Sequence, residues 1–345
     1  MKKREFGVMP DGTPVHQYTL ADGGMECDII TYGGALRSLR VPSRNGETAD
    51  ILLGFDTLED YRVQDKYMGA LIGRYANRIG GASFELNGVH CPLAQNDGPN
   101  HLHGGVAGFD KQVWKAEEAG DGHLALSLAS PDGQEGYPGA LAVRVTYRLE
   151  GDSLTIDYQA KSDRDTFCNL TSHGYFNLNG HAGGDILRHE VQLFADFYTP
   201  TDPRSIPTGE LAPVEGTPMD LRRPVSIGAR IDEGHPQLKY AGGYDHNWAV
   251  RGKRGTLRPA ARVAGPDTGI VLEVSTTQPG LQFYTGNFLD GCPAGKGGAA
   301  YGRRQGFCLE TQAYPDSPNR PDFPSAVLRA GEEYRERTVY RVGRG

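Results

Sequence analysis

Most of the chain consists of short segments in which apolar and polar residues alternate. Residues 123–130, 141–150 and 153–161 show this alternation, and related segments extend from 15–20 to 336–342. A two-residue period places every second side chain on the same face of a β-strand, so that one face is buried and the other is wetter. The pattern therefore predicts an antiparallel meander of strands.

Turn signals separate these segments and indicate where the chain reverses. Residues 83–93 read SFELNGVHCPL, and the Asn87-Gly88 dipeptide tolerates positive φ at both central turn positions, which predicts a β-hairpin. A helical pattern is present in residues 57–67, over two turns at most. The polar, loop-rich stretch 201–243 is expected to be an excursion that packs on the strands.

Composition and organisation indicate one large folded unit. Hydrophobic residues make up 38% of the chain and aromatic residues 9%, which is enough for a large core, and the 48 glycines suit a chain that turns often. No linker, charge block or internal repeat marks a second domain in the sequence. The expected fold is all-β, a large antiparallel β-sandwich formed by a single domain over residues 1–345.

The charge balance and the cysteines limit the partners and the compartment. The formal net charge is −7 without a stripe of Lys and Arg, which argues against nucleic acid or an anionic membrane as the partner. The sequence shows no secretory signal and no run of 18 apolar residues. The five cysteines are odd in number and lack CxxC spacing, which suits reduced thiols. A cytoplasmic protein with a small, uncharged partner is expected.

Five loop-flanked clusters place ionisable or amide side chains beside aromatic or glycine-rich backbone. They are GRYANRIGG (73–81), NHLHGG (100–105), TSHGYFNL (171–178), GYDHNW (243–248) and CLETQAYPDSPN (308–319). Each cluster alone has an ordinary structural explanation, such as a solvated ion pair or a histidine of the core. Together they recur at strand ends, where strands deliver polar groups to one groove.

A metal site is one interpretation of the histidines in these clusters. His101 and His103 are spaced to share one strand face, and His173 and His246 would complete a set of ligands. Arg78 in the neighbouring cluster would repel a cation. We therefore expect no metal.

A sugar-binding module without catalysis is a second interpretation. Tyr175, Asn77, Gln282 and Trp248 suit the faces and hydroxyls of a pyranose ring. A site that only binds does not require both a histidine and a glutamate. The presence of such an acid–base pair favours an enzyme.

The clusters, taken together and in order, resemble those of the aldose 1-epimerase (galactose mutarotase) family. The resemblance covers nearly the whole chain. It is carried by the blocks GRYANRI, NHLHGG with GFDKQVW, TSHGYFNL, YDHNW, TTQPGLQFYTGN and LETQAYPDSPN.

This resemblance implies both an activity and a set of site residues. The fold would be the galactose-mutarotase-like β-sandwich, and the activity would be interconversion of the α and β anomers of free aldoses such as glucose and galactose, without a cofactor. His173 would be the general acid and Glu310 the general base. The residues that would hold the substrate are Asn77, Arg78, His103, Tyr175, Asp245 and Gln282.

The chemistry explains why such a site needs two groups in opposite protonation states. Opening a cyclic hemiacetal requires a proton to leave the anomeric hydroxyl while another reaches the ring oxygen. A histidine titrates near 6.5 in its ordinary state, so a charged His173 needs a nearby carboxylate, such as Asp245 or Glu310. Arg78 and His103 would hold the base ionised.

A phosphosugar epimerase on the same fold remains an alternative. Phosphate recognition needs a cationic cluster, and Arg78 alone supplies too little, so Arg222 and Arg223 would have to approach the site. The sequence is compatible with a monomer or a homodimer.

Overall fold

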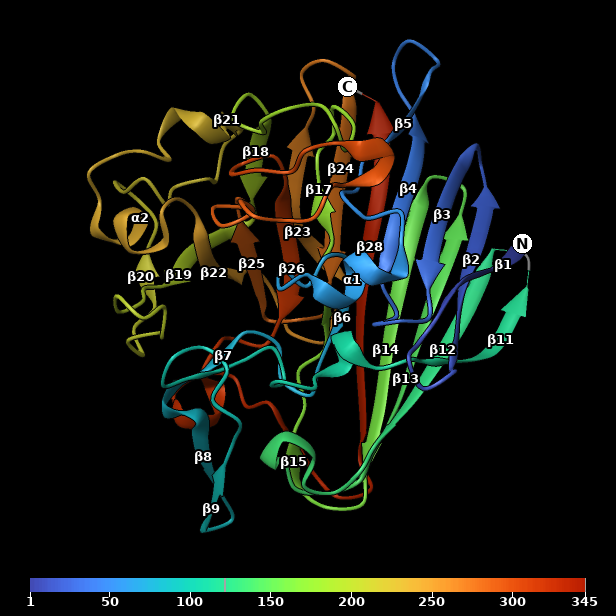
Figure 1. Cartoon of the computed structure of the whole chain (residues 1–345). Coiled ribbons are helices and arrows are strands. Elements are labelled where there is room, and N and C mark those ends of the chain that lie inside the picture. The colour runs from blue at the N-terminus through green and yellow to red at the C-terminus, as the bar shows by residue number, and fades with distance from the viewer. Residues whose placement is uncertain (121, 345) are drawn as a thin grey trace.

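The protein is an arrangement of antiparallel β-ladders in two layers with long connecting loops (Figure 1). The computed structural model describes residues 1–120 and 122–344. Every ladder between the strands named below is antiparallel, as predicted. The chain order of a meander holds over residues 2–50 and 115–162, whereas the last strand pairs with strands that are distant in sequence.

One layer is a sheet of nine strands. Its longest strands show the predicted alternation of buried and exposed residues, because one face packs on the core and the other meets solvent. In spatial order the strands are β11 (Lys115–Gly120), β12 (His123–Ser130), β13 (Leu141–Glu150), β14 (Ser153–Ser162), β28 (Glu333–Arg344), β24 (Ile270–Thr276), β23 (Arg258–Ala264), β18 (Glu190–Leu193) and β21 (Val225–Ser226).

The opposing layer contains a sheet of five strands and a sheet of six. An isolated antiparallel bridge between Leu52 and Phe176 joins the two sheets. The five-stranded sheet consists of β1 (Lys2–Val8), β2 (Pro14–Asp22), β3 (Met25–Ile30), β4 (Leu36–Pro42) and β5 (Thr48–Asp50). The six-stranded sheet has the order β17 (Tyr175–Phe176), β26 (Phe307–Gln312), β25 (Gly280–Tyr284), β22 (Asp245–Val250), β19 (Ala195–Thr199) and β20 (Ala212–Pro213).

Two central strands of the six-stranded sheet are buried on both faces. All residues of β25 and β26 are buried. Leu281 and Leu309 belong to the main core between the layers, where the Tyr340 hydroxyl of the facing sheet donates to the Leu309 carbonyl at 3.4 Å. Alternate residues on the same strands, such as Gln282 and Glu310, therefore point away from that core.

The remaining strands are short pairs that shape the loops. The predicted hairpin at Asn87-Gly88 is confirmed, with φ of 53° and 76° at the two turn residues. The pairs are β8 (Ser83–Leu86) with β9 (Val89–Pro92), β10 (His101–Leu102) with β7 (Arg78–Ile79), β16 (Thr171–Ser172) with β6 (Leu71–Ile72), and β15 (Thr166–Phe167) with β27 (Val327–Leu328).

Helix is limited to short turns. The predicted helix is confirmed as α1 (Leu58–Val63), where the Thr57 hydroxyl accepts the backbone N–H of Asp60. A second helix, α2 (Pro236–Ala241), lies inside the stretch that we expected to be loop. The 3₁₀ turns are η1 (Gly80–Ala82), η2 (Phe109–Lys111), η3 (Gln134–Gly136), η4 (Ile227–Ala229), η5 (Lys296–Gly298) and η6 (Ser317–Asn319).

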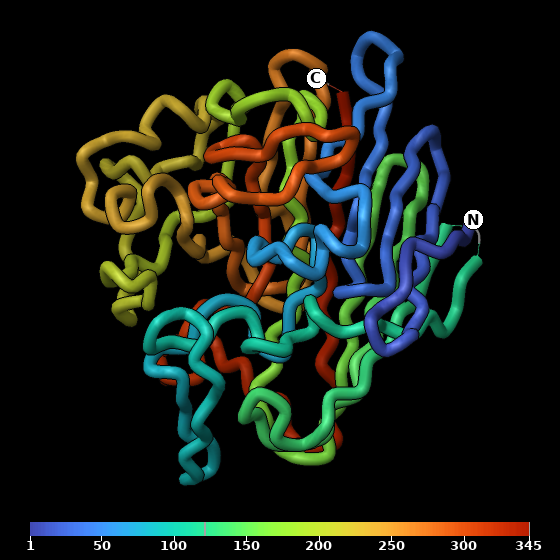
Figure 2. The backbone as a smooth tube through the Cα atoms, in the orientation of Figure 1, coloured from blue at the N-terminus to red at the C-terminus, as the bar shows by residue number. Residues whose placement is uncertain are grey.

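Segments that are distant in sequence come together beside the six-stranded sheet. The loop around β7 lies beside the segment that follows β26, as the backbone trace shows (Figure 2). The backbone N–H of Asp316 donates to the Arg78 carbonyl at 2.8 Å, and a carboxylate oxygen of Asp316 accepts from Gly80 at 2.9 Å. These bonds hold two of the predicted site clusters against each other.

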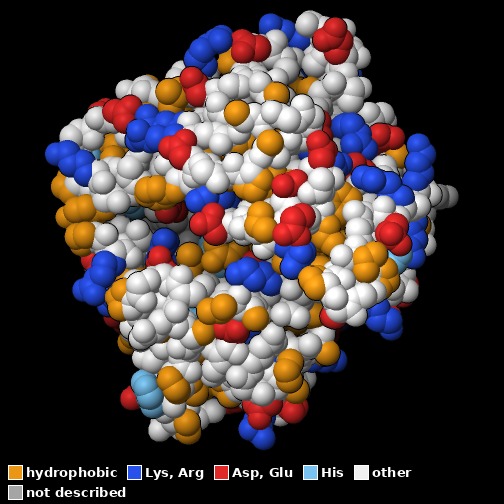
Figure 3. Space-filling model, viewed as in Figure 1, with side chains coloured by type: hydrophobic (Ala, Val, Ile, Leu, Met, Phe, Trp, Pro, Cys, Tyr) orange, Lys and Arg blue, Asp and Glu red, His pale blue; other side chains and the backbone are white. Residues whose placement is uncertain are grey.

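The charge distribution on the surface and the length of the helices concern possible partners. Basic and acidic side chains are interspersed on the face shown in Figure 3. Within the described residues, no helix is long and apolar enough to cross a membrane.

Candidate active site

The floor of the candidate site is one face of the six-stranded sheet. On β26, the two-residue period places Cys308, Glu310 and Gln312 on the same face. Glu310 pairs with Gln282 of the neighbouring strand, and Cys308 pairs with Tyr175 on the other side. Because directly opposed residues share a face, these side chains form one continuous polar floor.

His173 is held above this floor by the backbone between β16 and β17. Its N–H donates to the Ala70 carbonyl at 2.9 Å, and its carbonyl accepts from Gly69 at 3.0 Å. Its Nε2 atom lies 3.6 Å from Oε1 of Glu310, and only 5% and 2% of the two side chains are exposed. The imidazole and the carboxylate of the two clusters therefore meet in a buried pair.

The rim of the site contains two residues in the left-handed backbone region. Asn77 has a φ of 63° and His103 a φ of 51°. The two residues exchange hydrogen bonds. The His103 N–H donates to the Asn77 carbonyl at 3.0 Å, and the Asn77 N–H donates to Nδ1 of the His103 ring at 3.1 Å. An amide can only donate, so Nδ1 is unprotonated and the neutral ring carries its hydrogen on Nε2.

A glycine makes this rim possible. At Gly104, which has a φ of 86°, an added Cβ would lie 1.9 Å from the Gly73 carbonyl oxygen. Such a contact is far below any van der Waals distance, so only glycine lets the two rim segments approach each other. The glycine after His103 in the NHLHGG cluster is therefore a structural requirement of the site.

The charged residues of the rim form a connected set. Nε of Arg78 donates to Asp97 at 2.8 Å, and Asp245 raises the pKa of Arg78 through its negative charge, although burial opposes this. Gln282 donates to Oδ1 of Asp245 at 2.7 Å, and Gln312 donates to Gln282 at 3.2 Å. The side-chain amides of Gln282 and Gln312 thus hold the Asp245 carboxylate in place.

These groups surround a small pocket of about 150 Å³. Seven of the eight predicted site residues line it, and the eighth, Gln282, acts from behind through Asp245. The lining residues are Asp65, Lys66, Tyr67, Asn77, Arg78, Leu102, His103, His173, Tyr175, Asp245, Tyr284, Phe288 and Glu310.

Sequence reasoning missed part of this lining. Tyr67 has a φ of 56° and its ring centre lies 4.6 Å from that of His103, yet its residue type gives no sign of this position. Tyr284 was within reach, because it follows Gln282 by two residues on the same strand face. The exposed side chain of Phe288 was not predicted either.

Burial controls the ionisation of the central pair. Desolvation lowers the pKa of His173 to about 4. Burial also raises the pKa of Glu310 well above its ordinary value, Asp245 raises it further, and Arg78 opposes both effects. Desolvation therefore favours a neutral His173 in the free site, whereas the sequence led us to expect a charged one. The pair favours a neutral form in which it holds a single proton.

His103 is also neutral. Burial lowers its pKa well below the ordinary value, and the positive charge that His173 and Arg78 would add lowers it further. His103 therefore carries no positive charge with which to hold the base ionised. A neutral His103 instead offers an Nε2–H donor.

The geometry does not suit a metal. The predicted shared strand face of His101 and His103 is absent. Strand β10 ends at Leu102, and the positive φ of His103 turns its ring away from that of His101 and toward the pocket. His101 bonds Ala94 and Tyr137 instead. Ligand atoms of His103, His173 and Glu310 lie within 4.8 Å of one another, but a hydrogen on Nε2 of His103 leaves no lone pair there for a cation.

His246 also points away from the pocket. Its Nδ1 accepts the backbone N–H of Asp245 at 3.2 Å, and burial lowers its pKa to about 3. It is absent from the pocket lining of the described chain.

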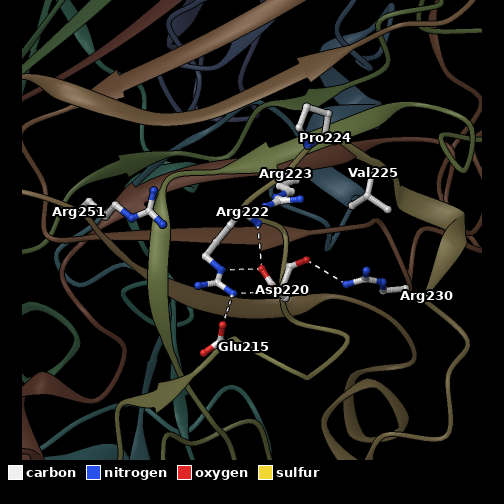
Figure 4. A pocket seen from close by; sticks show the side chains of 8 residues that line it. All are labelled: Glu215, Asp220, Arg222, Arg223, Pro224, Val225, Arg230 and Arg251. Carbon is white, nitrogen blue, oxygen red and sulfur yellow. Dashed lines mark hydrogen bonds and ion pairs between the residues drawn. The ribbon is translucent and has the colours of Figure 1, made fainter.

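Arg222 and Arg223 line a different cavity, of about 630 Å³ (Figure 4). The approach of these arginines to the site, which a phosphosugar epimerase would need, is therefore not found. The residues around this arginine cavity are Glu215, Asp220, Arg222, Arg223, Pro224, Val225, Arg230 and Arg251.

Comparisons with known proteins identify the family. Residues 16–341 match the family model of aldose 1-epimerase. The chain is 47% identical to the galactose mutarotases of Bos taurus and Homo sapiens, over 97% of this chain and 96% of each relative. It is 40% identical to the aldose 1-epimerase of Escherichia coli K12, over 97% of both chains. These matches define an isomerase built on an antiparallel β-sandwich. The chain belongs to the aldose 1-epimerase family.

Solved structures confirm the predicted fold. An aldose epimerase homologue from C. elegans has a TM-score of 0.86 and 27% identity, covering 95% of this chain and 98% of that one. A galactose 1-epimerase from Lactobacillus acidophilus has a TM-score of 0.87 and 27% identity, covering 100% and 98%.

Proposed function

We propose that the protein is a mutarotase that interconverts the α and β anomers of free aldoses such as glucose and galactose. The observation that carries this proposal is the buried pair of His173 Nε2 and Glu310 Oε1, 3.6 Å apart in a small polar pocket. The relatives that are 40–47% identical are named galactose mutarotase and aldose 1-epimerase, which supports it.

In the proposed reaction, the pair moves one proton in each direction. Glu310 takes the proton of the anomeric hydroxyl while His173 gives its Nε2 proton to the ring oxygen. The bond between C1 and the ring oxygen breaks, and an aldehyde forms at C1. Rotation about C1–C2 presents the other face of the aldehyde. Closure then returns both protons and gives the other anomer.

The low pKa of His173 and the raised pKa of Glu310 fit this exchange. A neutral pair, with the proton on Glu310, has the protonation pattern that follows ring opening. Before opening, the proton must pass to His173, and the positive charge of Arg78 favours the carboxylate form of Glu310. Because the pair holds one proton in both states, it needs no proton from solvent during turnover.

The remaining groups would hold the sugar hydroxyls. We assign Nε2–H of His103, the amide of Asn77 and the Arg78 guanidinium as donors, and the Asp245 carboxylate as an acceptor. Tyr175 would pack beside the ring. Gln282 would contribute indirectly, because it bonds the Asp245 carboxylate and faces it from the floor.

Polarimetry on freshly dissolved α-glucose and α-galactose tests the proposal. Catalytic amounts of the protein should speed the approach to anomeric equilibrium without changing the end point, which a binding module would not do. Glu310→Gln and His173→Asn should each reduce kcat by about 10²–10⁴-fold. Circular dichroism and the melting temperature provide the folding control. Unimpaired rates in either folded variant would refute the assigned roles.

The partner and compartment follow from the same proposal. The substrate is a monosaccharide, and nucleic acid and membranes are not expected to bind. We propose a cytoplasmic location for a monomer or homodimer. The five cysteines, all unpaired, support this compartment, because disulfides are rare there.

A further inference from the structure

The imidazole of His173 contacts two residues of the same strand. Its Nε2 atom faces Glu310, and its Nδ1 atom lies 3.6 Å from Sγ of Cys308. Cys308 and Glu310 are two positions apart on β26, so both side chains rise from one face. The mechanism proposed above uses only one of these two contacts.

Cys308 is a protonated thiol whose sulfur faces Nδ1 of His173. It is fully buried, and its pKa is raised well above the ordinary value by desolvation and then by the negative charges of Glu310 and Asp245. Tyr175 pairs with Cys308 in the ladder, and its ring centre lies 5.0 Å from that of His173. The contact between sulfur and imidazole is therefore closed to solvent.

The proposed reaction places a requirement on Nδ1. Nε2 must give a proton to the ring oxygen and later take it back, so Nε2 must alternate between protonated and free. If the neutral ring carried its hydrogen on Nε2, donation would leave an imidazolate, which is far too basic. Nδ1 must keep its hydrogen throughout, and a buried N–H needs an acceptor.

We propose that Cys308 is a positioning residue whose sulfur accepts the Nδ1–H of His173 and thereby keeps Nε2 as the nitrogen that faces Glu310 and the sugar. This inference rests on the proposed function. Cys308 does not touch the reacting atoms in this scheme. It sets the tautomer and the orientation of the general acid.

A thiol suits this position better than a stronger acceptor. Sulfur accepts hydrogen bonds weakly, so it holds the Nδ1–H without stabilising the charged ring. A carboxylate at the same place would favour the imidazolium and raise the pKa of His173. The weak acceptor Cys308 therefore keeps the pKa of His173 low, so that the charged ring is an acid strong enough to protonate a hemiacetal oxygen.

The other groups that face His173 do not compete for this role. Rings of Tyr67, Tyr175 and His103 lie 5.9, 5.0 and 5.2 Å from the His173 ring. Burial raises the pKa of both tyrosines and lowers that of His103, so all three are neutral near pH 7. Glu310 remains the facing group whose charge changes during turnover.

Two other hydrogen-bonding arrangements at Nδ1 are to be distinguished from the proposed one. The thiol could donate to Nδ1, which would put the ring hydrogen on Nε2 and contradict the proposal. The backbone carbonyl of His173 also favours a protonated ring. If this carbonyl alone held the Nδ1–H, removal of Cys308 would leave the tautomer unchanged.

Nitrogen NMR of the protein labelled with ¹⁵N-histidine separates these cases, because the two neutral tautomers give opposite Nδ1 and Nε2 shifts. The His173 signals are assigned by their loss in His173→Asn. The wild-type protein near pH 7 should show the Nδ1–H tautomer, and Cys308→Ala should show a mixture. An Nε2–H tautomer in the wild type, or an unchanged tautomer in Cys308→Ala, would overturn the proposal.

Kinetics provide the second readout. Cys308→Ala should lower kcat by about two- to tenfold, the range of one lost hydrogen bond, with little change in KM. Cys308→Ser should recover most of this loss, because its oxygen also accepts. Cys27→Ala, which removes a fully buried thiol from β3, is the matched control and should leave kcat unchanged. Equal kcat in the two alanine variants would also contradict the proposal.

The NMR result does not depend on catalysis. If the wild-type protein failed to speed mutarotation, the proposed function would fail while the tautomer measurement still reported on the Cys308 contact. An active enzyme with the wrong tautomer would instead reject only the role of Cys308.

Discussion

The pocket that contains His173 and Glu310, called the sugar pocket below after its proposed substrate, differs from the arginine cavity in how its charges are satisfied. The arginine cavity has about four times the volume, at about 630 Å³ against about 150 Å³. Two of its arginines are engaged with carboxylates, since Arg222 donates to both oxygens of Asp220 at 2.8 Å and Arg251 pairs with Asp196. In the sugar pocket, Oε2 of Glu310 is buried without a hydrogen-bond partner among the described residues.

Solvent exposure adds to this difference. The side chains of Arg222 and Arg251 are 28% and 46% exposed, whereas His173 and Glu310 are 5% and 2% exposed. Water and salt screen the exposed pairs, so their fields are weak, while charges in the buried pocket are screened much less. An unsatisfied buried carboxyl group is therefore a better indicator of the proposed chemistry than cavity size is.

Among variants that compare these two cavities, the largest effect should follow from removing the cation of the sugar pocket. Arg78→Leu would leave Asp97 and Asp245 without their positive partner and would raise the pKa of Glu310 further. We expect kcat/KM in polarimetry to fall by about 10²-fold, comparable to the loss of one preorganised charged donor. Arg78→Lys, which keeps the charge without the planar fork, should lose less.

The matched control lies in the arginine cavity. Arg251→Leu removes a guanidinium that is equally well paired, but its partner Asp196 is 42% exposed. The variant should keep the wild-type kcat/KM. A similar loss in Arg78→Leu and Arg251→Leu would show that burial does not distinguish the two regions.

The pH dependence should report the buried pair directly. His173 has a pKa of about 4, so the pair gains a second proton, and loses activity, only below about pH 4. In the other direction, activity is lost when Glu310 gives up the shared proton, at a pH well above its ordinary pKa. The rate, after subtraction of the spontaneous reaction, should therefore hold across neutral pH and fall about tenfold per pH unit below 4.

A variant sharpens this profile. Asp245 raises the pKa of Glu310, so Asp245→Asn should move the alkaline limb to lower pH while the acid limb remains in place. The two limbs are measured as log kcat/KM against pH. An acid limb centred near 6.5, the ordinary value of histidine, would contradict the desolvation argument.

The parts of this site that the sequence predicts are those that follow from local periodicity. Alternation predicts the long strands of the nine-stranded sheet, and the resemblance assigns His173 and Glu310, which the structure places 3.6 Å apart. Cys308 was also accessible to this reasoning, since it precedes Glu310 by two residues. Its contact with His173 was not, because the pairing of β17 with β26 is a tertiary choice.

The parts that escaped prediction depend on backbone conformations that residue type does not specify. Tyr67 and His103 both have positive φ, which is uncommon for such side chains and turns their rings toward the pocket. The assumption of a regular strand through His103 was wrong for this reason. Helix α2 spans six residues, too few for a helical period to stand out from a loop rich in proline and glycine.

The smallest effect is expected in the arginine cavity, where it tests the phosphosugar alternative. Arg222→Gln with Arg223→Gln should leave the rates on free glucose and on glucose 6-phosphate unchanged, because neither side chain lines the sugar pocket of the described chain. The wild-type protein should prefer the free sugar, since the positive charge of Arg78 is already balanced by Asp97 and Asp245 and a phosphate needs a cationic cluster. A phosphosugar rate that is high in the wild type and falls in the double variant would mean that the two cavities act together.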